Sequence, residues 1–122
     1  MGESARIIDY NRGIKITKPS DVEGLKGASP SFKKFILNDL EIYKKDLKIP
    51  GCTVEISVMK IYNDEFALGS VKQCDSESDH IWKKENNNWS KVLAGTINSP
   101  KWSCSGVELY RIPSALVPEC ME

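Results

Sequence analysis

The chain has 122 residues, enough for a single domain, residues 1–122, that buries roughly two thirds of its unfolded surface around one core. Its 17 lysines and arginines balance its 17 aspartates and glutamates, so we expect neither nucleic acid nor anionic lipid as a partner, because both select proteins with a basic excess. No apolar run approaches the roughly 20 residues of a membrane-spanning helix, so we expect no transmembrane segment.

Residues 1–28 are interpreted as a lead-in strand or N-terminal arm, with a short apolar alternation at Ile14 and Ile16, followed by one short helical turn. Residues 29–46 then show the clearest periodicity in the chain and predict an amphipathic helix, with Ser29 as N-cap and Pro30 in the first turn. The helix should end before Pro50, because proline excludes the residue before it from the helical region. The apolar residues that recur at helical spacing are Phe32, Phe35, Ile36, Leu40 and Tyr43.

From residue 52 the apolar spacing changes from that of a helix to that of a strand. Apolar and polar residues alternate over residues 54–58, and the chain then turns near Asn63-Asp64 into a second run at residues 66–71. These two runs predict a β-hairpin.

A second pair of strand-like runs follows at residues 80–84 and 89–94. Three consecutive asparagines, Asn86–Asn88, separate the two runs, and asparagine tolerates the positive φ that a tight turn requires. Residues 52–96 therefore predict two β-hairpins, and residues 99–122 predict a C-terminal loop.

The four cysteines are an even number without the short spacing of a metal-binding knuckle, so we expect no metal site. Cys52 and Cys74 flank the first hairpin symmetrically about its turn, as a cross-strand disulfide would. Cys104 and Cys120 would then close the C-terminal loop. The alternative is four buried free thiols in a reducing compartment.

Two disulfides indicate an oxidising compartment, so we expect a periplasmic or secreted protein. The first residues after Met1 lack both the charged region and the apolar region of a signal peptide. We therefore expect that an export leader has been removed from this chain.

The order of elements predicts an α+β fold with two disulfides. One long amphipathic helix would pack on an antiparallel sheet of about four strands, made of the two hairpins. A cystatin-like or NTF2-like half-wrapped sheet is the nearest common architecture, and such an analogy carries no function by itself.

Over residues 65–120 the chain resembles small exported bacterial domains of unknown function. The shared features are an Ala-Leu-Gly strand, a Trp-x-Lys-Val strand after an asparagine-rich turn, and a C-terminal loop with Ile-Pro between two cysteines. The residues that carry the resemblance are Ala67–Gly69, Trp89–Val92, Cys104, Ile112–Pro113 and Cys120. The resemblance implies export and a Cys104–Cys120 disulfide, and it implies no catalytic residues.

The sequence shows no recognisable catalytic set. His80 is the only histidine, so any serine- or cysteine-based mechanism would have to transfer its proton through this residue. No nucleophile elbow and no glycine-rich phosphate loop are present, so we expect a protein without enzymatic activity and without a cofactor. The alternative interpretation of His80 is a histidine at the solvated edge of a strand.

The large aromatic residues concentrate in the C-terminal half of the chain. They either fill the core beneath the helix or form a recognition patch on the sheet, where aromatic anchors dominate binding energy. Both possibilities stay open, because the register of the second hairpin decides whether its two tryptophans share a face. The candidate binding residues are Tyr62, His80, Trp82, Asn86, Asn87, Trp89 and Lys91.

These features favour a non-enzymatic, exported bacterial domain that binds a protein partner in the cell envelope. An immunity or inhibitor protein fits the size and the neutral charge, with the hairpin tip Asn86–Trp89 as its contact. One alternative is a cystatin-like or NTF2-like domain that binds a small ligand, or performs simple acid/base chemistry, in a pocket lined by Tyr43, Tyr62 and His80. Another is a structural accessory domain of the envelope. The oligomeric state does not follow from the sequence.

Overall fold

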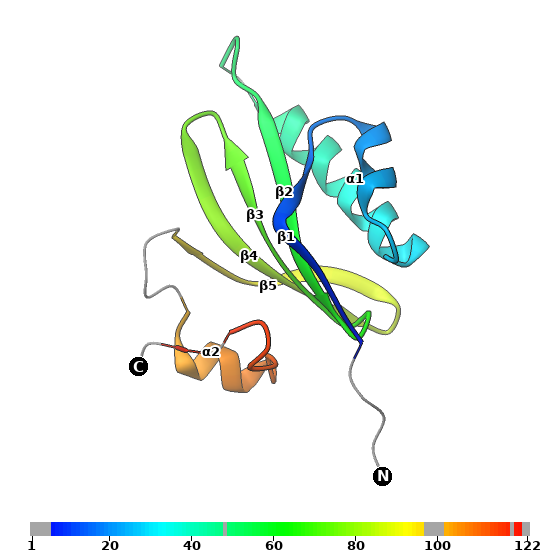
Figure 1. Ribbon diagram of the computed structural model, residues 1–122. Helices are drawn as coiled ribbons and strands as arrows, with labels where there is room; N and C mark the ends of the chain where they lie inside the picture. Colours follow the sequence, from blue (N-terminus) through cyan, green and yellow to red (C-terminus); the bar gives the residue numbers. More distant parts are fainter. Residues whose placement is uncertain (1–5, 48, 97–101, 118, 121–122) are drawn as a thin grey trace.

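The computed structural model describes residues 6–47, 49–96, 102–117 and 119–120. The elements in chain order are strand β1 (Ile7–Ile16), the 3₁₀ helix η1 (Pro19–Gly24), helix α1 (Pro30–Asp46), strands β2 (Val54–Tyr62), β3 (Phe66–Gln73), β4 (Ser76–Glu85) and β5 (Asn88–Thr96), and the short helix α2 (Cys104–Leu109). The five strands form one antiparallel sheet in the order β1-β2-β3-β4-β5 (Figure 1).

The prediction of about four strands is wrong, because the N-terminal arm supplies a fifth. β1 pairs with β2, but the register shifts between Asp9 and Ile14. Within this irregular stretch Asn11 has φ 62° and Gly13 has φ 94°. Such a bulge interrupts the apolar alternation by which a strand is recognised in a sequence.

Helix α1 begins and ends close to the predicted limits. The Ser29 hydroxyl accepts a hydrogen bond from the Phe32 backbone N–H at 3.3 Å, and Pro30 occupies the first turn. This arrangement satisfies one of the helix's free N–H groups at a position where proline costs no hydrogen bond. The buried face of the helix carries Phe32, Ile36 and Leu40.

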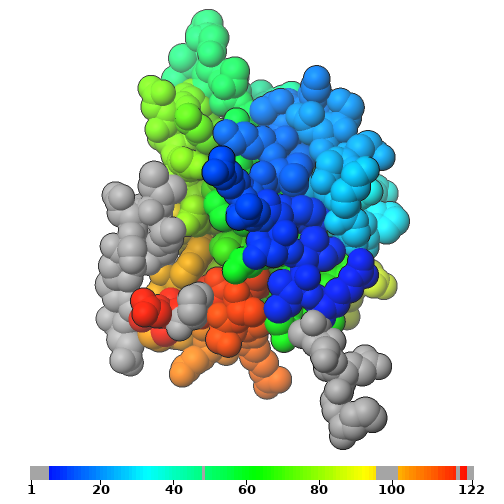
Figure 2. All heavy atoms as spheres, in the orientation of Figure 1, coloured from blue at the N-terminus to red at the C-terminus, as the bar shows by residue number. Residues whose placement is uncertain are grey.

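The two faces of the sheet are covered by different parts of the chain. One core lies between α1 and the sheet, and the other lies between the sheet and the segment after β5 (Figure 1). In Figure 2 this C-terminal segment, in orange and red, packs at the lower end of the molecule. The buried residues of the second core are Phe66, Ile81, Trp102, Ile112, Leu116 and Val117.

The predicted fold class is corrected at this point. A cystatin-like or NTF2-like sheet of about four strands, covered by a helix on one face only, does not describe the protein. The sheet has five strands and its second face is covered as well. The physical reason is that Trp102 and Ile112 are apolar enough to bury a second sheet face, although the segment around them lacks a regular period.

Both predicted disulfides are present. Cys52 and Cys74 lie 4.8 Å apart at their Cα atoms and close the open end of the β2–β3 hairpin, whose turn falls at Asn63-Asp64. Cys104 and Cys120 lie 5.0 Å apart and join the start of α2 to the end of the described chain. None of the helices in the described ranges is long and apolar enough to cross a membrane.

Gly69 on β3 leaves space for the ring of Trp82. A Cβ atom at position 69 would lie 2.7 Å from Cζ3 of Trp82 and would also collide with the Ser57 carbonyl oxygen. Trp82 is fully buried, so its ring cannot move aside into solvent. Only glycine fits between the two.

We predict that Gly69→Ala destabilises the fold by about 1–3 kcal/mol, because the added methyl group overpacks a core that cannot relax. Urea unfolding of the two proteins measures the difference. Lys72→Ala, at an exposed position on the same strand, is the control and should change the stability by less than about 0.5 kcal/mol. Equal stability of Gly69→Ala and the parent protein would contradict the packing described above.

Candidate functional site

The tip of the β4–β5 hairpin is a tight turn built from asparagines, as predicted. Glu85 pairs with Asn88, and the two residues between them, Asn86 and Asn87, have φ values of 54° and 66°. Both positions of a two-residue turn of this kind need positive φ, which asparagine adopts at low cost. Asn86, Asn87 and Asn88 are all exposed.

A groove of about 460 Å³ separates this hairpin tip from helix α1. One wall belongs to the first turns of α1 and the other to the start of β5. The residues that line the groove are Ser31, Lys34, Phe35, Asn38, Asn87, Asn88 and Trp89. The two walls of the groove therefore come from segments that lie about fifty residues apart in the sequence.

Stacked aromatic rings form the floor of the groove. The rings of Phe35 and Trp89 lie 6.5 Å apart with an angle of 28° between their planes, and Phe32 meets Trp89 edge-on at 4.8 Å. Trp89 is only 7% exposed. Its main role is therefore to hold the hairpin against α1, while polar side chains form the accessible rim.

A chain of hydrogen bonds connects the hairpin, the start of α1 and the β2–β3 turn. Nε1 of Trp89 donates to Oγ of Ser31 at 3.3 Å, and this hydroxyl lies 3.1 Å from Oγ of Ser29. Ser29 donates to one carboxylate oxygen of Asp64 at 2.7 Å, and Nζ of Lys84 donates to the other at 2.8 Å. Because each side chain in this hydrogen-bond network is paired, the network fixes the position of the hairpin relative to the helix.

The rim of the groove carries polar groups without partners in the described part of the chain. The Lys34 side chain forms no ion pair there, and the side-chain amides of Asn38, Asn87 and Asn88 form no hydrogen bond there. One ammonium group and three amides are thus available to an external molecule. Amides can both donate and accept hydrogen bonds, which suits them to contact a polypeptide.

His80 lies elsewhere, beneath α1 on strand β4. It is 4% exposed, its Nε2 lies 3.0 Å from Oγ of Ser78, and its ring meets Trp82 edge-on at 6.0 Å. Burial and, to a smaller extent, the positive charge of Lys91 together lower its pKa to about 4, against the opposing effect of Asp79. The imidazole is therefore neutral at pH 7 and cannot act there as a general acid.

Two further titratable groups on α1, Asp39 and Tyr43, interact electrostatically with each other, and Asp39 also interacts with Lys91 of β5. Burial raises the pKa of Asp39, and the nearby Lys91 opposes this effect. Burial also raises the pKa of Tyr43, with a smaller contribution from the charge of Asp39. Neither Asp39 nor Tyr43 lines the groove.

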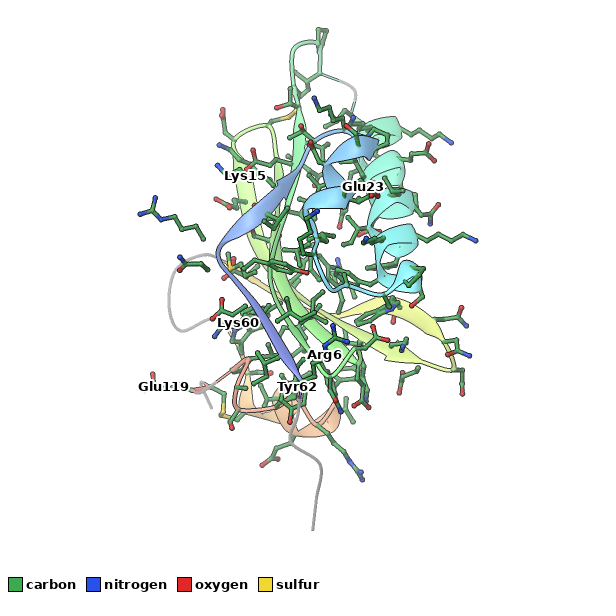
Figure 3. The ribbon with its side chains drawn as sticks, turned by 45° about the vertical axis from the view of Figure 1, so that its right-hand side comes forward. Arg6, Lys15, Glu23, Lys60, Tyr62 and Glu119 are labelled. Carbon is green, nitrogen blue, oxygen red and sulfur yellow. A yellow bond between two sulfur atoms is a disulfide. The ribbon has the colours of Figure 1, made fainter. Side chains whose placement is uncertain are left out.

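The structure brings together only some of the candidate residues. Asn87 and Trp89 line the groove, and Asn86 lies exposed beside them at the tip. Tyr62 packs with Phe66 in the second core, at the end of the sheet that carries the C-terminal segment (Figure 3). Trp82 is fully buried in the first core and Lys91 is exposed on β5.

About half of the residues that line the groove were not among the predicted binding residues. These residues lie on helix α1, whereas the predicted contact lay on the hairpin. Ser31, Lys34, Phe35 and Asn38 follow the i, i+3, i+4 spacing of one helix face, which is visible in the sequence. That spacing does not reveal which strand the face will meet. Only the docking of the hairpin against α1 identifies them.

Comparison with other proteins assigns this groove no role. No protein family, curated protein or solved structure compared with the chain matches it. The Cys104–Cys120 disulfide implied by the resemblance to exported bacterial domains is present, whereas membership of such a family stays a prediction. Among residues 6–47, 49–96, 102–117 and 119–120, no group of three potential ligands could hold a metal ion.

We predict that the protein loses about 2 kcal/mol of stability between pH 7 and pH 5 because of His80. Its folded pKa of about 4 lies below the ordinary value of 6.5, so the unfolded chain binds the proton more tightly. The stabilisation is complete above pH 6.5 and is lost as the pH falls toward 4.

Urea unfolding at a series of pH values measures this loss. His80→Gln removes the only histidine of the chain and serves as the control, in which the stability should change much less over the same interval. Identical pH profiles for the two proteins would show that His80 titrates normally in the folded state.

Proposed function

We propose that this chain is a non-enzymatic binding domain, exported from a bacterial cell, that recognises a protein partner in the cell envelope through the groove between α1 and the β4–β5 hairpin. The observation that carries the proposal is the combination of a fixed aromatic floor with unpaired polar groups along the rim. Interfaces commonly combine a packed aromatic centre with a polar rim.

The occupant of the groove is a protein segment with at least one exposed carboxylate. Lys34 supplies the positive charge for this carboxylate, since no described acidic residue pairs with it. The amides of Asn38, Asn87 and Asn88 then bond to backbone N–H and C=O groups of the same segment. The groove needs little reorganisation for this, because the hydrogen bonds from Trp89 to Asp64 already hold its walls in place.

Export is supported by the two disulfides, which persist in oxidising compartments such as the periplasm or the extracellular space. A rigid hairpin tip on a small, stapled scaffold suits a protein that blocks the surface of another. We therefore assign an immunity- or inhibitor-like role to the domain.

We prefer this role to that of a domain with a small-ligand pocket or acid/base activity. The pocket expected for that alternative needs Tyr43, Tyr62 and His80 together. Tyr62 packs in the second core, whereas His80 contacts Trp82 in the first, on the other face of the sheet. A neutral, buried imidazole is also poorly suited to proton transfer at pH 7.

We predict that the double substitution Lys34→Ala/Asn87→Gly weakens partner binding about tenfold or more, which corresponds to about 1.4 kcal/mol. Glycine at position 87 retains the positive φ of the turn and removes only the side-chain amide. The oxidised domain, immobilised, is exposed to an envelope extract of its source, and a stoichiometric partner is identified by mass spectrometry. The purified partner is then titrated against each variant.

The matched control is Lys15→Ala/Asn11→Gly on strand β1. It removes one lysine and one asparagine side chain, the same two types, from exposed positions. Asn11 also has positive φ, but neither Lys15 nor Asn11 lines the groove. Its affinity should stay within about twofold of the parent value. Equal losses in the two double variants, or no loss in the groove variant, would reject the groove as the contact. Failure to capture any partner would favour a structural role.

A further inference from the structure

Two buried nitrogen atoms between α1 and the sheet lack hydrogen-bond partners. They are Nδ1 of His80 and Nε1 of Trp82, the two buried side-chain atoms within the described ranges for which no protein partner is present. His80 is 4% exposed and Trp82 is fully buried. An unpaired buried polar group costs about 1–3 kcal/mol, and most such groups in proteins are paired with the protein or with ordered water.

The two atoms belong to neighbouring side chains on the same face of β4. His80 and Trp82 are two residues apart, and their ring centroids are 6.0 Å apart. The two rings meet edge-on, so their unpaired nitrogen atoms belong to one buried aromatic contact. We therefore consider one small molecule that pairs with both.

The chemistry of the two nitrogens is complementary. The indole Nε1 of Trp82 can only donate a hydrogen bond. The other ring nitrogen of His80, Nε2, lies 3.0 Å from Oγ of Ser78, and if Nε2 carries the proton and donates it there, Nδ1 is left with a free lone pair. Trp82 then offers a proton and His80 an acceptor.

We propose that a single internal water molecule binds between His80 and Trp82, accepts the indole proton of Trp82 and donates a proton to Nδ1 of His80. Water is the smallest molecule that donates and accepts hydrogen bonds, and buried water commonly pairs polar groups that the protein leaves unpaired. A larger polar ligand would need space beside a fully buried ring. This site is independent of the groove and of any partner that binds there.

The test is a crystal structure at a resolution that resolves internal water, together with long-range ¹H–¹⁵N spectra of His80. We expect one solvent peak within about 2.7–3.2 Å of both nitrogen atoms. We also expect the spectra to show a proton on Nε2 and a free lone pair on Nδ1. Electron density without such a peak would overturn the proposal, and so would a proton on Nδ1.

The variant His80→Phe provides a further check, because it retains an aromatic ring and removes the acceptor. We expect the solvent peak to be lost in this variant. A peak that stays in place at Trp82 would show that His80 does not hold the water, which would contradict the bridge. If the variant does not fold, the measurements on the parent protein still decide.

Discussion

The packing of three aromatic side chains between α1 and the sheet is the contact on which the rest of the structure depends. Phe32 of α1 lies 6.1 Å from Trp82 and 4.8 Å from Trp89, so one helical residue contacts both strands of the second hairpin. Trp82 reaches this position only because Gly69 leaves space on the neighbouring strand. The aromatic cluster thus determines where the hairpin lies relative to the helix, and thereby creates the groove.

Polar side chains refine the position that the aromatic cluster sets. The hydrogen bonds from Trp89 through Ser31 and Ser29 to Asp64 join three segments far apart in the chain. Directional bonds of this kind specify one arrangement among several that apolar packing alone would allow. The hairpin tip therefore projects from a fixed base, and the groups on its rim can be arranged for a partner before binding.

Much of the local structure could be predicted from the sequence, because local interactions determine it. The helix follows from Ser29, Pro30 and the apolar spacing after them, and the hairpin tip follows from three asparagines that tolerate positive φ. The symmetry of Cys52 and Cys74 about their turn was enough to predict their disulfide. Strand β1 could be predicted only as a strand or an arm and was not counted in the sheet, since its bulge at Asn11 and Gly13 breaks the alternation that identifies strands.

What the sequence by itself determined was the type of most segments, the two cysteine pairs and the exposed tip of the second hairpin. Only the tertiary structure decided that Trp82 and Trp89 lie in the core and that Lys34 and Asn38 face Asn87 across a groove. It also decided that the C-terminal segment covers the second face of the sheet. The reason is that such contacts join residues distant in sequence. They depend on the packing of whole elements, which no local pattern of residues encodes.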